Sequence, residues 1–131
     1  MINGQLFDNF SYTATYSFLD VDDDDVSKTL PEYSATLILN YKYRAYHFNV
    51  TTQYLSEYSQ SSTKGDGLGD YITIDASISK HLTDTSKLTL YGKNVTNEQY
   101  AEAYMSGYRS GMLGYIYNRG ACVGLLYNIE F

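Results

Sequence analysis

The twelve residues from 120 to 131, Gly-Ala-Cys-Val-Gly-Leu-Leu-Tyr-Asn-Ile-Glu-Phe, decide how the rest of this sequence is interpreted. Every second residue is apolar or aromatic, and these are Ala121, Val123, Leu125, Tyr127, Ile129 and Phe131. The residues between them are mostly small or polar. A period of two indicates a β-strand with one apolar face, because successive side chains point to opposite sides of a sheet. This stretch therefore predicts a strand that runs to the final aromatic residue.

The composition agrees with a β-rich protein and argues against several other classes. The 131 residues include 16 Tyr, 5 Phe and a single Pro, and the formal net charge is −6. Tyr and Phe are favoured in strands, whereas a nucleic-acid partner would require a basic surface. No apolar run approaches the roughly 18 residues of a membrane helix. Strands that cross a membrane as part of a barrel stay possible, because only alternate residues then face lipid.

The same alternation recurs upstream and predicts five more strands. We expect them at residues 10–18, 33–44, 46–54, 71–79 and 87–93. Residues 1–5 are interpreted as the tail of an earlier strand, and residues 96–119 as a long loop. The predicted fold is all-β, an antiparallel meander of about six long strands that occupies residues 1–131 as one unit.

Aromatic residues stand at the two ends of the predicted strands, with aliphatic or small residues between them. The apolar set of residues 33–43 begins and ends with Tyr, and so does the apolar set of residues 46–54. This arrangement is typical of a lipid-facing band between two interfacial girdles, because tyrosine is stable half in hydrocarbon and half in water. A soluble β-sandwich or a lipocalin-like binding module, with the apolar side chains turned inward, is the alternative that periodicity alone leaves open.

The connections between the predicted strands alternate in length. Those near residues 44–45 and 82–86 are short, and those at residues 20–32, 56–70 and 96–119 are long. Antiparallel strands place alternate connections at opposite ends, so all short turns should share one end and all long loops the other. Transmembrane barrels have short periplasmic turns and long extracellular loops. We therefore expect a part of a transmembrane barrel, with Phe131 at the short-turn end.

Several motifs resemble the C-terminal barrel segment of TonB-dependent outer-membrane receptors. The segment Gly92-Lys-Asn-Val-Thr-Asn-Glu-Gln-Tyr100 is similar to the family's motif at the end of the penultimate strand, through Asn94, Asn97 and Tyr100. Arg119 resembles the Gly-Arg piece before the last strand, although the order here is Arg-Gly. Residues 30–33, Leu-Pro-Glu-Tyr, are similar to the family's entry into an earlier strand. The final strand resembles the family's closing strand, in which Val123, Leu125, Tyr127, Ile129 and Phe131 would form the motif read by the barrel-assembly machinery.

The resemblance implies a plugged barrel of 22 strands in the bacterial outer membrane. Such receptors take up iron–siderophore complexes or other scarce nutrients, driven by the TonB complex. This chain would supply about the last six strands, and the plug would lie on other segments. No signal peptide follows Met1, so we expect a C-terminal piece of a longer precursor. Its partners would be outer-membrane lipid, the rest of the receptor and a siderophore-type ligand, with no cofactor. Another outer-membrane β-protein, such as an autotransporter or small barrel, is a further alternative.

No enzyme site is expected from the sequence. His47 and His81 stand on different predicted strands without a catalytic partner at a known spacing, so both are interpreted as ordinary polar residues. If the strands on either side of Asp84 pair about that residue, Asp75 and Lys93 lie roughly opposite one another. A lumen-side ion pair that contacts the plug, worth about 0–1 kcal/mol, is favoured over a role in relaying substrate.

For three other features of the sequence, a structural role is favoured over a functional one. The acidic run at residues 20–25 is read as a solvated loop, although clustered carboxylates could also bind calcium. The single cysteine, Cys122, is read as a small strand residue. Packing within the last loop is favoured over contact with an aromatic ligand for its tyrosines, which are Tyr100, Tyr104, Tyr108, Tyr115 and Tyr117.

Overall fold

The computed structural model describes residues 1–20, 30–58, 68–106 and 113–130, and these residues form nine β-strands. Among the described residues, no helix has the length and apolar character needed to span a membrane. The acidic run, apart from Asp20, and Phe131 lie outside the described residues, so the expectations for them stay predictions.

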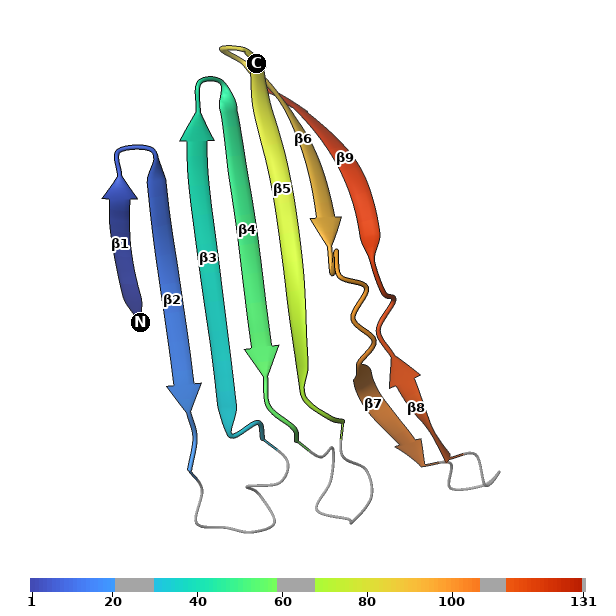
Figure 1. The fold of residues 1–131 in the computed structure, drawn as a ribbon. Coiled ribbons are helices and arrows are strands. Elements are labelled where there is room, and N and C mark those ends of the chain that lie inside the picture. The colour runs from blue at the N-terminus through green and yellow to red at the C-terminus, as the bar shows by residue number, and fades with distance from the viewer. Residues whose placement is uncertain (21–29, 59–67, 107–112, 131) are drawn as a thin grey trace.

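Seven strands form one antiparallel sheet in which neighbours in sequence are neighbours in space (Figure 1). They are β1 (Ile2–Phe7), β2 (Phe10–Phe18), β3 (Tyr33–Tyr43), β4 (Tyr46–Leu55), β5 (Tyr71–Thr83), β6 (Ser86–Lys93) and β9 (Cys122–Ile129). The predicted meander is confirmed, and the tail expected at residues 1–5 belongs to strand β1, which runs to Phe7 and pairs with β2. The sheet therefore has seven strands where about six were predicted.

The long loop expected at residues 96–119 is wrong in part, because two of its segments form a second sheet. Strands β7 (Ala101–Ser106) and β8 (Leu113–Tyr117) pair antiparallel and extend beyond β6 and β9 (Figure 1). Both strands are short, and their register shifts between Ala101 and Ala103. A short, irregular hairpin has little alternation to detect, and two strands alone are only marginally stable in water. Contacts from outside the hairpin are therefore needed to hold it.

Within the part of the chain that the structure describes, the seven-stranded sheet is a single layer without an enclosed core. Leu68 and Ala101 are the only buried hydrophobic residues among those described. Leu37 is 40% exposed, Phe48 37% and Leu125 66%, although each belongs to the apolar set of its strand. In a sandwich or lipocalin these side chains would be covered by a second layer. That alternative is therefore wrong for this fold.

All short turns lie at one end of the sheet, and the strand ends that flank the long connections lie at the other (Figure 1). The turns between β1 and β2, β3 and β4, and β5 and β6 are each two residues long, and we call this the short-turn end. The opposite end of the sheet, where β2, β4 and β6 end and β3, β5 and β9 begin, is the long-loop end. The predicted alternation is confirmed, and β9 runs toward the short-turn end.

Candidate functional site

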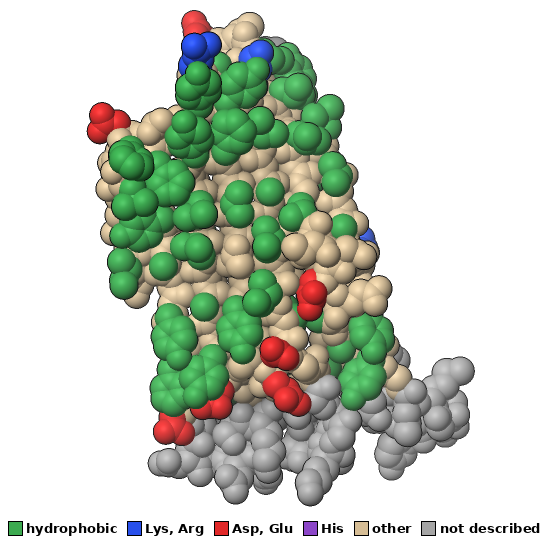
Figure 2. Space-filling model, viewed as in Figure 1, with side chains coloured by type: hydrophobic (Ala, Val, Ile, Leu, Met, Phe, Trp, Pro, Cys, Tyr) green, Lys and Arg blue, Asp and Glu red, His purple; other side chains and the backbone are tan. Residues whose placement is uncertain are grey.

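One side of the sheet, which we call the apolar face, carries the alternate residues that the sequence predicted to be apolar. Residues of this face lie opposite one another from strand to strand. Ala14 is opposite Leu37, Leu37 is opposite Thr52, and Thr52 is opposite Ile74. A row of small and aliphatic side chains therefore crosses four strands. Figure 2 shows this face, with hydrophobic side chains distributed over the whole width of the sheet.

Aromatic rings form a row at each end of the apolar face. At the short-turn end the Tyr41 ring lies 6.4 Å from that of Phe10 and 6.0 Å from that of Phe48. At the long-loop end the Tyr33 ring lies 6.4 Å from that of Tyr16 and 5.2 Å from that of Phe18. Tyr33 and Tyr41 stand on the same strand, about 26 Å apart at ~3.3 Å per residue. This separation matches the band of about 25 Å that a transmembrane barrel presents to lipid.

A hollow of about 430 Å³ interrupts the apolar face between β4 and β9. Its apolar lining includes Phe48, Ile78, Leu90 and Val123. Gly92 forms part of the floor, and a Cβ there would lie 2.6 Å from Val95 Cγ1. The absence of a side chain at Gly92 therefore lets Val95 fold over the strand. The exposed surface of the hollow is almost entirely apolar.

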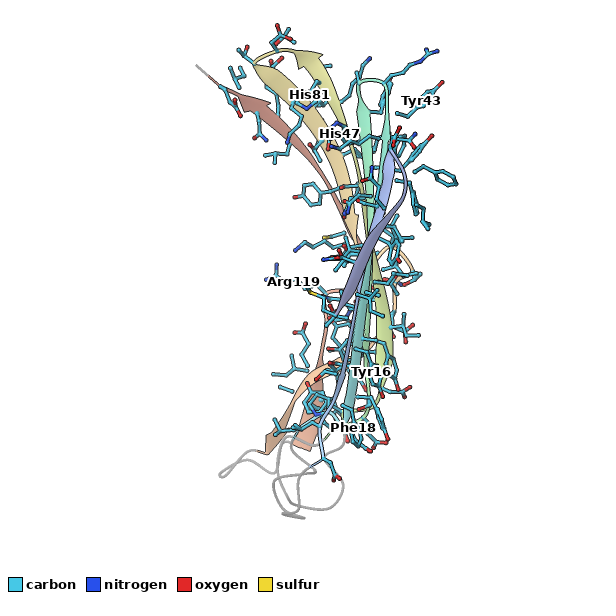
Figure 3. All side chains as sticks on the ribbon, turned by 90° about the vertical axis from the view of Figure 1, so that its left-hand side faces the viewer. Tyr16, Phe18, Tyr43, His47, His81 and Arg119 are labelled. Atoms are coloured by element: carbon cyan, nitrogen blue, oxygen red, sulfur yellow. The ribbon has the colours of Figure 1, made fainter. Side chains whose placement is uncertain are left out.

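The other side of the sheet, the polar face, carries the histidines and Arg119. Figure 3 shows His47, His81 and Arg119 on the opposite side from Tyr16, Phe18 and Tyr43, with β6 and β9 leaning toward the histidines. The polar face is thus the concave one.

The rings of His47 and His81 lie 5.5 Å apart, in an edge-to-face arrangement. The sequence placed them on separate strands without a partner, and the sheet brings them together. No group of three or more metal-binding side chains occurs among the described residues.

The ion pair predicted for Asp75 and Lys93 is wrong, although the register behind it is right. Ala76 lies opposite Gly92, so Asp75 and Lys93 are the next pair along. The Asp75 carboxylate instead accepts a hydrogen bond of 2.8 Å from the backbone N–H of Asn94. The chain turns away from the sheet at this point, and a fixed amide is then a nearer partner than a flexible ammonium group.

Asn94 begins a group of hydrogen-bonded residues that we call the polar clasp, made of Asn94, Asn97, Glu98 and Asn118. Asn94 is buried and has a positive φ of 47°, a conformation that asparagine tolerates better than most residues. Its Nδ2 donates to the Glu98 carbonyl at 2.8 Å, and its Oδ1 accepts from the Glu98 N–H at 2.9 Å. Both ends of one side-chain amide therefore hold the same peptide segment.

Asn97 connects the polar clasp to the start of β9. Its Oδ1 accepts a hydrogen bond of 3.0 Å from the N–H of Ala121. Gly120, immediately before, has a φ of 72°, and a Cβ there would lie 2.7 Å from Asn97 Oδ1. The positive φ and the close approach both require glycine at this position.

Asn118 connects the polar clasp to the β7–β8 hairpin. Its Nδ2 donates to the Glu98 carbonyl at 2.9 Å, and its Oδ1 accepts from the Tyr100 N–H at 3.3 Å. The Tyr100 ring stacks on Tyr71 of β5, with centroids 3.9 Å apart and planes 14° from parallel. Burial raises the pKa of the Tyr100 phenol, with the nearby carboxylates of Glu102 and Asp75 adding to the effect. The clasp thus links β5, β6, β9 and the hairpin.

The residues of the family-like motif occupy different places in this arrangement. Asn94 and Asn97 are members of the polar clasp and Tyr100 is held by it, whereas the Arg119 side chain projects from the polar face (Figure 3). The predicted site residues lacked two members of the clasp, namely Glu98, which takes part through its backbone, and Asn118. The signal for Asn118 in the sequence was its place beside Arg119 and Gly120, which the resemblance already used.

The described residues of the expected closing-strand motif lie on the exposed apolar side of β9. This strand pairs with β6 through Leu88 opposite Tyr127 and Leu90 opposite Leu125. The motif residues within the described range are Val123, Leu125, Tyr127 and Ile129, all exposed. In the described sheet β9 forms one edge and β1 the other.

The tyrosines of the last connection contact one another and the sheet. Tyr115 and Tyr117 have ring centroids 6.3 Å apart, and Tyr100 stacks on Tyr71. These contacts agree with the packing interpretation. The side chain of Tyr104 and the whole of Tyr108 lie outside the described residues.

Comparison with known proteins identifies the fold. No protein-family model and no curated protein sequence matches the chain. The ferric yersiniabactin uptake receptor FyuA from Yersinia pestis is similar over 98% of this chain, with a TM-score of 0.81 and 17% identity. The siderophore receptor PiuA from Acinetobacter baumannii is similar over 96%, with a TM-score of 0.74 and 18% identity. The ferric-catecholate import receptor Fiu from E. coli K12 is similar over 98%, with a TM-score of 0.75 and 15% identity.

The chain spans about a fifth of the length of these receptors, covering 22% of FyuA and 20% of each of the other two. The likeness extends over nearly all of this chain, so the whole described sheet has the fold of one part of a TonB-dependent receptor barrel. The fold resemblance predicted from the motifs is therefore confirmed.

Proposed function

We propose that this chain is the C-terminal part of the barrel wall of a TonB-dependent transporter in the bacterial outer membrane. The observation that carries the proposal is the single-layer sheet whose apolar face has an aromatic row at each end, on a fold shared with the receptors FyuA, PiuA and Fiu. A wall of this kind has hydrocarbon on its convex side and a wet lumen on its concave side. The positions of Leu37 and His47 on opposite faces support that assignment.

The unpaired edges of the sheet support a role as part of a larger wall. In lipid, every backbone N–H and C=O must find a partner within the protein, so membrane sheets close into barrels. β1 and β9 each have a neighbour on one side only within the described sheet. Further strands of the receptor would pair with these edges, and closure would remove the risk of aggregation that exposed edges bring.

The proposed orientation places the long-loop end outside the cell and the short-turn end in the periplasm. Long loops outside and short turns inside are the rule for transmembrane barrels. The proposed assembly motif of Val123, Leu125, Tyr127, Ile129 and Phe131 would then lie on the strand that reaches the periplasm and contacts the barrel-assembly machinery. The TonB complex would act through a plug, which would lie on other segments of the receptor.

The proposed cargo is a siderophore-type complex or a similarly scarce nutrient, and the proposed activity is transport without an enzymatic step. The three fold neighbours are an uptake receptor, a siderophore receptor and an import receptor by their own descriptions. The polar clasp would hold the last long loop at the mouth of the lumen. The clasp is thus proposed as a positioning element.

Membrane fractionation tests the proposal. The chain, expressed with an export signal, should be recovered from outer-membrane fractions and released only by detergent or denaturant. Recovery as a soluble monomer that unfolds cooperatively without detergent would refute it. Sequencing the coding region upstream separates this proposal from another outer-membrane barrel, because a transporter requires an in-frame plug.

A further inference from the structure

Two basic side chains at the short-turn end are held against tyrosine rings of the apolar face. The guanidinium carbon of Arg44 lies 5.2 Å from the centroid of the Tyr43 ring, and Lys80 Nζ lies 5.2 Å from the centroid of the Tyr46 ring. Each is a cation–π contact, which restrains the side chain without neutralising its charge.

The four residues form one continuous row, which we call the basic rim. Tyr43 lies opposite Tyr46 across β3 and β4, and Tyr46 lies opposite Lys80 across β4 and β5. The rim stands just beyond the aromatic row of Tyr41 and Phe48, on the side of the short turns. Figure 3 shows Tyr43 on the same side of the sheet as Tyr16 and Phe18. In a bilayer, this level is where hydrocarbon gives way to headgroups.

The carboxylates at the short-turn end lie near other cations. Asp8 lines a hollow that it shares with Lys42, and Asp84 and Glu130 line another with Lys87. Lys42 and Lys87 belong to the polar face, since Lys42 lies opposite His47 and Lys87 opposite His81. Within the described part of the chain, Arg44 and Lys80 have no carboxylate partner. Their charges are thus available to an external anion.

The apolar face is asymmetric in charge along its length. Figure 2 shows most of the basic side chains at the short-turn end and most of the acidic ones toward the long-loop end. At the long-loop end, the Glu32 side chain is hydrogen-bonded to the Tyr33 side chain, so a carboxylate accompanies a tyrosine where the other end has a cation. A lipid with a negative headgroup would therefore be attracted to the short-turn end and repelled from the other.

We infer that the basic rim binds the phosphate of an anionic phospholipid in the leaflet at the short-turn end. The inference rests on the proposed function, because it requires the apolar face to be in a bilayer. Arg44 and Lys80 would each donate charge-assisted hydrogen bonds to phosphate oxygens, while Tyr43 and Tyr46 cover the glycerol and upper acyl region. The ligand class is a glycerophospholipid with net negative charge, and the contact sets the depth of the wall in that leaflet.

Vesicle flotation tests the inference with the full chain. Binding is measured to phosphatidylcholine vesicles with and without phosphatidylglycerol, for the native chain and for Arg44→Asn/Lys80→Gln. Asparagine is chosen because Arg44 has a φ of 54°, which asparagine tolerates. The matched control is Lys42→Gln/Lys87→Gln, which removes the same charge from the polar face at the same end.

The native chain should bind more tightly to the anionic vesicles than to the neutral ones. In the rim variant, the ratio of the two affinities should fall roughly fivefold for each basic group removed. The control should lose much less, and Arg44→Lys/Lys80→Arg should restore most of the preference. Equal losses in rim variant and control, or competition by inorganic phosphate at matched ionic strength, would overturn the inference. Equal binding of the native chain to both vesicles would overturn it and leave the proposed function intact. Failure to bind either vesicle would also overturn the inference, because the apolar face would then not be in the bilayer that the inference requires.

Discussion

The substitution Leu37→Lys tests whether the apolar face meets hydrocarbon. Leu37 stands on β3 midway between Tyr33 and Tyr41, four residues from each aromatic row. At ~3.3 Å per residue this places it about 13 Å along the strand from either row, close to the middle of the proposed bilayer. A lysine at the midplane of a transmembrane barrel costs about 2–4 kcal/mol. This loss of stability corresponds to a decrease of roughly 30- to 900-fold in the equilibrium constant for folding in lipid.

The magnitude should depend on depth and on the face of the sheet. Tyr41→Lys, at the aromatic row, should cost only about 0–1 kcal/mol, because the ammonium group can reach the interface. Thr36→Lys, next to Leu37 but on the polar face opposite Gln53, should cost little, because that face is wet. The three variants thus differ in position while introducing the same side chain.

The assay is urea extraction of the chain from lipid vesicles, followed by tyrosine fluorescence and flotation. The urea concentration at which half of the chain is extracted should fall most for Leu37→Lys, slightly for Tyr41→Lys and least for Thr36→Lys. Equal midpoints for Leu37→Lys and Thr36→Lys would refute the reasoning, since neither face would then be in hydrocarbon. A larger loss for Thr36→Lys would mean that the faces are assigned the wrong way round.

Three further predictions concern the polar clasp. Gly120→Ala should destabilise the fold by about 1–3 kcal/mol, because a side chain at a φ of 72° is strained and would meet Asn97 Oδ1; faster proteolysis between β6 and β9 would show it, and an unchanged rate would contradict it. Asn94→Ala should cost about 1–3 kcal/mol in denaturant titrations, since the Glu98 N–H and C=O lose their partner, whereas no change in midpoint would mean that water replaces both bonds. The Tyr100 phenol, whose pKa is raised above 10.0, should ionise later than exposed tyrosines in an ultraviolet titration; the unfolded chain releases this proton first, so stability should fall as the pH rises above about 10, and an identical titration of Tyr100→Phe would contradict the assignment.

Strand positions and faces could be predicted because both depend on local pattern. Alternation from Phe10 to Phe18 matches β2 at both ends, and the pattern from Tyr33 onward matches β3 to within one residue. The short connection predicted at residues 82–86 leaves an antiparallel partner as the simplest option, and the register considered about Asp84 is the one that the structure has. The strand β1 was only partly anticipated, since a pattern of few residues is weak on its own.

The polar clasp could not be assembled from the sequence, because its hydrogen bonds join residues far apart. Asn97 and Ala121 are 24 positions apart, and Asn118 and Glu98 are 20 apart. The resemblance singled out Asn94, Asn97 and Tyr100 as motif residues, but it did not indicate their hydrogen-bond partners. The ion pair between Asp75 and Lys93 failed for the same reason, since a backbone amide whose position depends on the turn at Asn94 took its place.

The sequence by itself determined that this chain forms an antiparallel meander with one apolar and one polar face, because a period of two is a property of each strand alone. The tertiary structure decided three things: that the apolar face is left uncovered, that His47 and His81 meet, and that Arg44 and Lys80 share a rim. Each depends on how strands lie beside one another and curve. The physical reason is that an odd or even position within a strand decides to which side of the sheet a side chain points. Register and curvature decide which side chains from other strands it contacts on that side.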